Sequence, residues 1–206
     1  MIMHKKNSSW KNITRFAVLT AATIALGVLM AGCSIGPLYL HETASTVGKS
    51  KMDIATGYGD AGPVLKLNYG LTENLDIGYA TEVYSTGIRA KYAFINGKEG
   101  EPSLATAAGA GVSPDGNHYY VDLIGGYQHG DWEPYGSLRY VRVNFDATTY
   151  DSGFGDFKVD KSHSSYGQYF LGLRYWVTQR WFLSLEASQL SFNPHAIAGA
   201  AVGYRY

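Results

Sequence analysis

Apolar and polar residues alternate one by one along many segments of this 206-residue chain. In one such segment, Leu75, Ile77 and Tyr79 fall on one face, whereas Asp76 and Glu82 fall on the other. This two-residue period is that of a β-strand with one apolar and one polar face. Apolar residues at helical spacing do not persist for three turns anywhere beyond the amino-terminal region. The chain is therefore predicted to be all-β.

The alternating segments also have the length and number of strands in a closed barrel. The stretch 75–94 is far longer than one membrane crossing requires at roughly 3.3 Å per residue, so a reversal is expected near 85–87. Even numbers of antiparallel strands of this length are typical of up-and-down barrels that span a membrane. The sequence predicts an antiparallel transmembrane β-barrel of about ten strands, with eight or twelve as alternatives. The predicted limits are 50–59, 63–70, 75–84, 87–95, 103–112, 118–129, 134–145, 164–176, 181–190 and 196–206.

Aromatic residues distinguish this barrel from a soluble one, which alternation alone would also fit. They gather beside every second connection, and these connections are mostly short. On strands that alternate in direction, such residues reach a single rim, where a belt of Tyr and Trp is expected at a membrane–water interface. The residues predicted at this rim are Tyr69, Tyr92, Phe94, Tyr127, Trp132, Tyr175, Trp176 and Trp181.

The amino-terminal region has the three parts of a secretory signal peptide. A basic start is followed by an apolar run over 16–30 and then by small residues that end at Cys33, the only cysteine of the chain. The apolar run is too short and wrongly flanked for a spanning helix. The segment 1–32 is therefore predicted to be removed. The alternative is a plain cleaved signal followed by an incidental thiol.

The residues at the end of this signal resemble the lipobox of bacterial lipoproteins. The matching run is Leu29-Met30-Ala31-Gly32-Cys33, with Met30 where the family usually has Leu. The resemblance implies that the Cys33 sulfur takes a diacylglycerol and that the new amino terminus receives an acyl chain such as palmitate. Ser34, which is not Asp, implies sorting to the outer membrane.

The carboxy terminus alternates to its last residue, the aromatic Tyr206. The whole chain thus resembles small bacterial outer-membrane β-barrel proteins that carry a lipoprotein signal. The resemblance implies a signal at 1–32, an acylated tether at 33–48 and a barrel at 49–206, with both termini on the periplasmic side of a Gram-negative cell envelope. The implied partners are outer-membrane lipids and the export, lipoprotein-processing and barrel-assembly machineries.

Charge limits what the mature chain can bind. Removal of 1–32 takes away four basic residues and no acidic residue, so the mature chain has thirteen basic and seventeen acidic residues. This negative balance argues against nucleic acid as a partner. Charges of both signs lie on the predicted inner face, where they are expected to pair with each other. A general diffusion pore needs about sixteen strands, so only a narrow gated pore remains as an alternative. These inner charges are Lys66, Asp76, Glu82, Arg89, Lys91, Asp122, Arg139, Arg174, Glu186 and Arg205.

Histidines supply the candidates for chemistry. His163 and Ser165 share one face of a strand, and their spacing resembles that of PagL-like lipid A deacylases, which implies a base and a nucleophile. The nearest downstream acid is Glu186, which falls mid-strand rather than at the rim. His118, His163 and His195 lie at the rim opposite the aromatic belt and are candidate metal ligands. The alternative is that all three histidines are solvated rim residues without a catalytic or cofactor role.

The longest connection, 146–163, mixes aromatic, acidic and glycine residues. Such a loop is either a recognition loop for a surface partner or a hairpin with no partner. The sequence therefore predicts an outer-membrane barrel lipoprotein, anchored through Cys33, with a structural or surface-interaction role and no catalysis. The alternatives are a PagL-like lipid hydrolase at the extracellular rim, a lipid-anchored periplasmic lipocalin-like binding barrel and a narrow gated pore.

Overall fold

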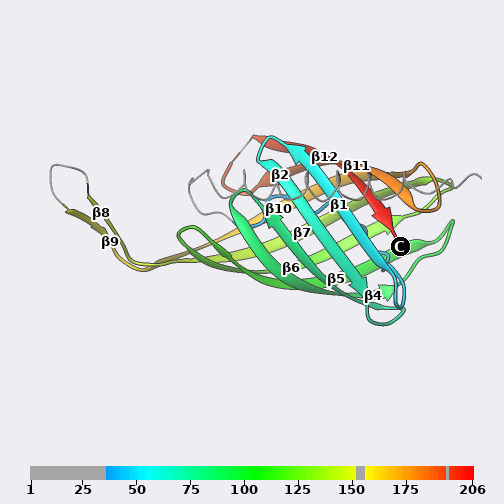
Figure 1. The fold of residues 1–206 in the computed structure, drawn as a ribbon, viewed down its shortest axis with the longest axis horizontal. Coiled ribbons are helices and arrows are strands. Elements are labelled where there is room, and N and C mark those ends of the chain that lie inside the picture. The colour runs from blue at the N-terminus through cyan, green and yellow to red at the C-terminus, as the bar shows by residue number, and fades with distance from the viewer. Residues whose placement is uncertain (1–35, 152–155, 194) are drawn as a thin grey trace, which may run out of the picture.

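Ten antiparallel strands form a closed barrel in the computed structural model, which describes residues 36–151, 156–193 and 195–206 (Figure 1). Each strand pairs with its neighbours along the chain, and β1 pairs with β12 to close the wall. Among the described residues, no helix is long and apolar enough to cross a membrane. The wall strands are β1 (Met52–Gly59), β2 (Gly62–Gly70), β3 (Leu75–Glu82), β4 (Ser85–Ile95), β5 (Pro102–Ser113), β6 (Gly116–Tyr127), β7 (Trp132–Phe145), β10 (Ser162–Trp176), β11 (Trp181–Leu190) and β12 (Ala196–Arg205).

The predicted strand number is confirmed, and every predicted limit lies within two residues of the observed one. The reversal expected near 85–87 lies earlier, at Val83 and Tyr84, because Glu82 and Ser85 pair directly across a two-residue turn. A short hairpin of β8 (Thr148–Asp151) and β9 (Asp156–Val159) adds a separate two-stranded sheet inside the connection between β7 and β10. The sequence predicted a long connection here but not this pairing.

The two ends of the barrel differ in their connections. The carboxy-terminal end holds the start of β1, the end of β12 and the connections 71–74, 96–101, 128–131 and 177–180. The opposite end holds the turns 60–61, 83–84 and 114–115 and the connection 191–195. It also holds the long connection 146–161, which contains the β8–β9 hairpin. We refer to this end of the barrel, opposite the carboxy-terminal end, as the far end.

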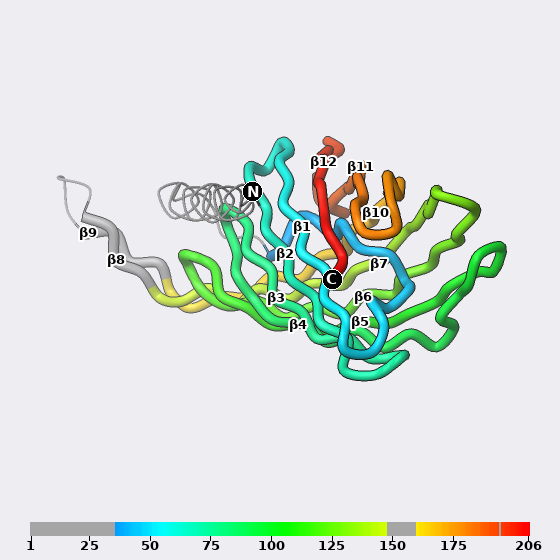
Figure 2. The backbone as a smooth tube through the Cα atoms, turned by 45° about the vertical axis from the view of Figure 1, so that its right-hand side comes forward, coloured from blue at the N-terminus to red at the C-terminus, as the bar shows by residue number. Residues whose placement is uncertain are grey.

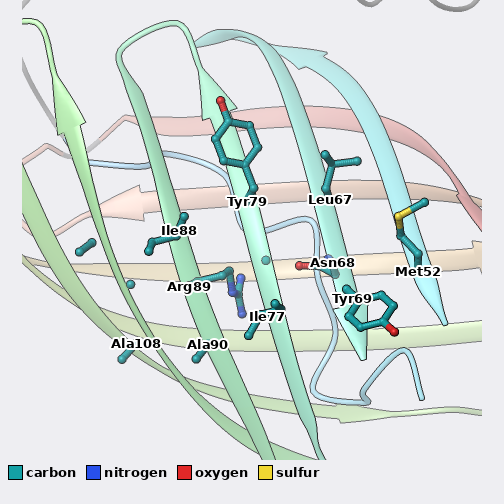
Figure 3. A pocket seen from close by; sticks show the side chains of 13 residues that line it. Met52, Leu67, Asn68, Tyr69, Ile77, Tyr79, Ile88, Arg89, Ala90 and Ala108 are labelled. Atoms are coloured by element: carbon teal, nitrogen blue, oxygen red, sulfur yellow. The ribbon is translucent and has the colours of Figure 1, made fainter. Parts of the chain in front are cut away.

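The faces of the wall are as the alternation predicts. Leu171 is 74% exposed and Leu185 is 60% exposed, whereas Ser184 and Glu186, the polar neighbours of Leu185, are buried. Figure 3 shows a stretch of the outer wall where Tyr79, Ile77 and Ile88 project outward around an apolar hollow of about 760 Å³. A soluble barrel would present the reverse arrangement, with its apolar face inside.

The aromatic rim is largely where it was predicted. Tyr69, Tyr92, Trp132 and Trp181 are all exposed on the outside near the carboxy-terminal end. Ring contacts link neighbouring strands there, such as Trp132 with Tyr175 at 4.5 Å between ring centroids.

Two details of the predicted rim are wrong. Trp176 follows Tyr175 in the alternation and turns inward, where its Nε1 donates to Glu133 at 3.3 Å. Exposed aromatic residues are also not confined to one rim, because another set lies farther along the strands. Its members are Tyr58, Tyr79, Tyr119, Tyr140 and Tyr169.

Candidate functional site

The interior of the barrel holds a stretch of the chain's own backbone. We call residues 36–47 the lumenal segment; it precedes β1 and appears as the blue tube inside the wall (Figure 2). Leu38, Tyr39, Leu40 and Ala44 are all at most 2% exposed. The segment was expected to lie in the tether 33–48, and the described part of that tether instead fills the lumen. The physical reason is that polar side chains of the wall bind many backbone N–H and C=O groups of the segment.

The lumenal segment runs from one end of the barrel to the other. At the carboxy-terminal end, the Val47 N–H donates to the Asp76 carboxylate at 3.1 Å. At the far end, the Gly36 N–H donates to the Tyr166 hydroxyl at 3.0 Å. Tyr39 also reaches the far end, where its hydroxyl accepts a hydrogen bond from the N–H of Ala61 at 2.7 Å.

Two buried carboxylates of the wall bind four consecutive backbone amides. Glu82 accepts from the N–H of Leu38 at 2.7 Å and of Tyr39 at 3.1 Å. Glu186 accepts from the N–H of Leu40 at 2.7 Å and of His41 at 2.6 Å. Hydrogen bonds to a charged acceptor are each worth about 1.5–3 kcal/mol, so these two residues are strong anchors for the segment.

Donors of the wall bind the carbonyl groups of the same segment. Buried Arg, Gln, Lys and Ser side chains reach these oxygens from several strands. Because the contacts go to backbone atoms, they fix an extended chain largely without regard to its side chains. The contacts are Arg139 to Pro37 at 2.9 Å, Gln168 to Leu38 at 2.9 Å, Ser188 to Leu38 at 3.2 Å, Lys66 to Leu40, Arg174 to His41 at 3.3 Å, and Lys91 to Thr43 at 3.0 Å and Ser45 at 2.7 Å.

One side chain of the segment adds charge to the lumen. The Glu42 carboxylate lies 2.5 Å from Arg89 and 2.9 Å from Lys91, and all three side chains are buried. A buried ion is costly unless it is paired, so Glu42 balances cations that the wall alone leaves in excess at this level. Lys91 also contacts Asp76 at 3.3 Å.

The inner charges were expected to pair with each other, and this is only partly correct. Arg139 binds Asp122 through two hydrogen bonds of 2.6 and 3.0 Å, and Arg205 binds Asp53 at 2.7 and 2.8 Å. The carboxylates of Glu82 and Glu186 instead accept hydrogen bonds from backbone amides of the lumenal segment. This use was not predictable, because residues 33–48 were expected to form a tether outside the barrel.

Small residues of the wall make room for the segment. A Cβ atom placed on Gly199 would lie only 2.7 Å from Cε1 of Tyr39, so this position requires glycine for the Tyr39 ring to pack against β12. The Tyr39 ring also stacks on His41, with 5.3 Å between ring centroids. The apolar run Leu38-Tyr39-Leu40 is the one sequence signal that could have revealed the buried segment. Large apolar side chains favour buried positions, whereas a tether in water would expose all three.

The candidate hydrolase residues are not brought together. His163 and Ser165 are exposed near the start of β10, while the Glu186 carboxylate is buried and engaged by Leu40 and His41. Glu186 pairs across the sheet with Gly172, seven residues along β10 from Ser165, which corresponds to roughly 23 Å. Glu186 therefore cannot orient the imidazole of His163.

The three candidate metal ligands also lie in different surroundings. His118 is buried, and its Nδ1 lies 3.2 Å from the hydroxyl of Ser113, whereas His163 and His195 are exposed. Within the described residues, no group of three His, Cys, Asp or Glu side chains could hold a metal ion. The description of all three histidines as solvated rim residues is thus wrong for His118, because its side chain turns inward. Cys33 lies outside the described residues.

Comparison with protein-family models and with curated sequences finds no match for this chain. Among solved structures it is similar to the translocator domain of the autotransporter NalP from Neisseria meningitidis, at 12% identity over 95% of this chain and 97% of that one, with a TM-score of 0.43. It is also similar to the amino-terminal β-barrel domain of Pseudomonas aeruginosa OprF, at 14% identity over 76% and 96%, with a TM-score of 0.39. The fold assigned here rests on the strand pairing of this chain itself.

Proposed function

We propose that this protein is an outer-membrane β-barrel lipoprotein, anchored through Cys33, whose closed barrel has a structural or surface-interaction role. The observation that carries this proposal is a wall with its apolar face outward and a lumen filled by residues 36–47. A filled lumen suits a rigid scaffold better than a conduit. The barrel would then serve to hold loops and an anchored terminus at the envelope.

The outward apolar face supports the membrane setting. In lipid, every backbone polar group needs an internal partner, and a closed barrel supplies one for each residue of its wall. All charged side chains of this wall but one turn inward, where they find partners without contact with lipid, and the exception, Arg142, lies near the far-end limit of β7. The lipocalin-like alternative gains no support, because a soluble barrel of that kind keeps its apolar face inside.

The unequal connections support an orientation. Outer-membrane barrels have short periplasmic turns and longer extracellular loops. The turns 60–61, 83–84 and 114–115 of the far end are shorter than any connection of the other end, so the orientation rests on the connection 146–161, which is by far the longest. On that ground we place the far end outside and the carboxy-terminal end at the periplasm. Loops on a rigid barrel are where binding commonly resides, so this connection is the favoured surface for a partner.

Membrane fractionation tests the proposal directly. The full-length protein is expected in the outer-membrane fraction, with a mobility on gels that changes on heating, as stable barrels show. Recovery in the soluble periplasmic fraction would contradict it.

The anchor has its own test. Cys33→Ser is expected to abolish labelling by a palmitate analogue, because the sulfur that would accept the diacylglycerol is gone and the signal can no longer be processed as that of a lipoprotein. Cys33→Ala is the matched variant, and Ser34→Ala, which keeps the thiol, should stay labelled. Undiminished label on Cys33→Ser would remove Cys33 as the modified residue.

A third prediction separates this role from the hydrolase alternative. We expect lipid A from cells that produce the wild-type, His163→Ala or Ser165→Ala protein to be identical by mass spectrometry. The reason is geometric, since Glu186 is roughly 23 Å along the strand from this pair and cannot orient the imidazole. Loss of an acyl chain that requires both His163 and Ser165 would favour the hydrolase.

A further inference from the structure

We propose that the amino-terminal end of the mature protein leaves the barrel at the far end, so that Cys33 and its acyl chains are displayed at the cell surface. This inference rests on the proposed function for the membrane and its orientation. It departs from the simplest arrangement of a lipoprotein barrel, in which the tether stays in the periplasm and its lipid enters the inner leaflet.

The contacts of the lumenal segment follow a single direction. Thr46 and Val47 meet residues of the carboxy-terminal end, namely Asn96 at 3.1 Å and Asp76 at 3.1 Å. His41 and Leu40 meet Glu186 in the middle of β11. The partners thus move steadily away from the periplasmic end as the chain is followed backwards from β1.

The first described residues complete this path. Leu38 and Tyr39 bind Glu82, the last residue of β3, which lies next to the turn 83–84 of the far end. Gly36 binds the hydroxyl of Tyr166, which lies on β10 beyond the end of its pairing with β11. The segment therefore enters from the periplasmic end and reaches the extracellular end.

Chain length then limits where the anchor can be. Cys33 precedes Gly36 by three residues, and three residues span at most about 11 Å even when fully extended. Returning to the periplasmic end would take a second passage as long as the lumenal segment itself. The lipid bonded to Cys33 is consequently confined to the extracellular side of the membrane.

The route of the segment also constrains assembly. The lumen is filled by buried side chains of the wall and by the segment itself, which leaves no passage for a diacylglycerol group through the finished barrel. The wall must therefore close around the segment, with the pairing of β1 and β12 coming after the segment is in place. The amide-binding carboxylates Glu82 and Glu186 would hold it during that closure.

An engineered disulfide tests the path. A Cβ atom placed on Gly36 lies 3.8 Å from Cβ of His118, a separation that suits a disulfide, but also 2.8 Å from Cγ1 of Val141. Gly36→Cys with His118→Cys, in a Val141→Ala background, is expected to cross-link in most molecules and to shift on non-reducing gels. The matched pair, Gly36→Cys with Glu133→Cys at the periplasmic end of β7, is expected to stay reduced. Cross-linking of the second pair instead of the first, in heat-modifiable barrels, would overturn the proposal.

A second measurement addresses the surface. An epitope inserted directly before Gly36 is expected to bind antibody equally on intact and permeabilised cells, as should an epitope in the far-end turn 114–115. An epitope in the connection 96–101 should bind only after permeabilisation. Labelling of the 114–115 epitope but not of the one before Gly36 on intact cells would contradict the threaded path alone. Failure of both on intact cells would contradict the proposed outer-membrane orientation.

Discussion

Deleting residues 36–47 is expected to convert a silent barrel into one that conducts ions across planar lipid bilayers. The deletion joins Ile35 directly to Gly48 and removes an extended chain that fills the lumen. A ten-strand barrel is narrow, and the space left behind would be the width of one peptide lined by charged side chains. Water and small ions could enter such a polar channel, whereas the wild-type protein has its own backbone in that place.

Two matched variants show whether the carboxylate anchors keep the lumen closed. The double change Glu82→Ala with Glu186→Ala removes the acceptors of four backbone amides, each bond worth about 1.5–3 kcal/mol, and should give brief openings. Glu82→Gln with Glu186→Gln keeps a neutral acceptor oxygen at each site and should open less often. A heat-modifiable deletion protein that remains silent would show that the wall alone closes the barrel.

Leu185→Arg is expected to destabilise the folded barrel in lipid vesicles by about 2–4 kcal/mol, because it places a charge on the lipid face near mid-strand. Leu185 is 60% exposed and pairs with Leu173 and Ala200, which continue the apolar face to either side. In water, the same change at so exposed a position would cost little.

The control is Val112→Arg, which has nearly the same exposure, 57%, but lies one residue from the far-end limit of β5. At such an interfacial depth a charge costs only about 0–1 kcal/mol. Denaturant-induced unfolding in vesicles, followed by the fluorescence of the tryptophans, measures both. Equal stability of the two variants would argue that Leu185 does not face lipid.

The strands of this barrel were predictable because each wall residue faces one of two sharply different surroundings. On β11, the apolar residues Leu183 and Leu185 and the polar residues Ser184 and Glu186 carry that difference in the residue types themselves. Trp176 shows the limit of an argument from residue type, since an aromatic ring suits the rim whichever way it turns, whereas its place after Tyr175 in the alternation directs it inside, to Glu133.

The lumenal segment was not predictable from the same pattern. Side chains of the wall hold this segment through its backbone atoms. Its own sequence therefore shows no alternation of apolar and polar residues. Glu186 illustrates the consequence, because from the sequence it was only a candidate acid, whereas in the structure it binds the amides of Leu40 and His41 and the hydroxyl of Tyr135. The β8–β9 hairpin was missed for a different reason, as its four-residue strands are too short to show alternation clearly.

Amide hydrogen exchange of the intact protein in detergent micelles tests the central claim most directly. The N–H groups of Leu38, Tyr39, Leu40 and His41 are hydrogen-bonded to buried carboxylates, so they are predicted to exchange as slowly as those of the wall strands. Exchange of these four amides at the rate of an unstructured peptide, while the strands remain protected, would contradict a lumen occupied by residues 36–47.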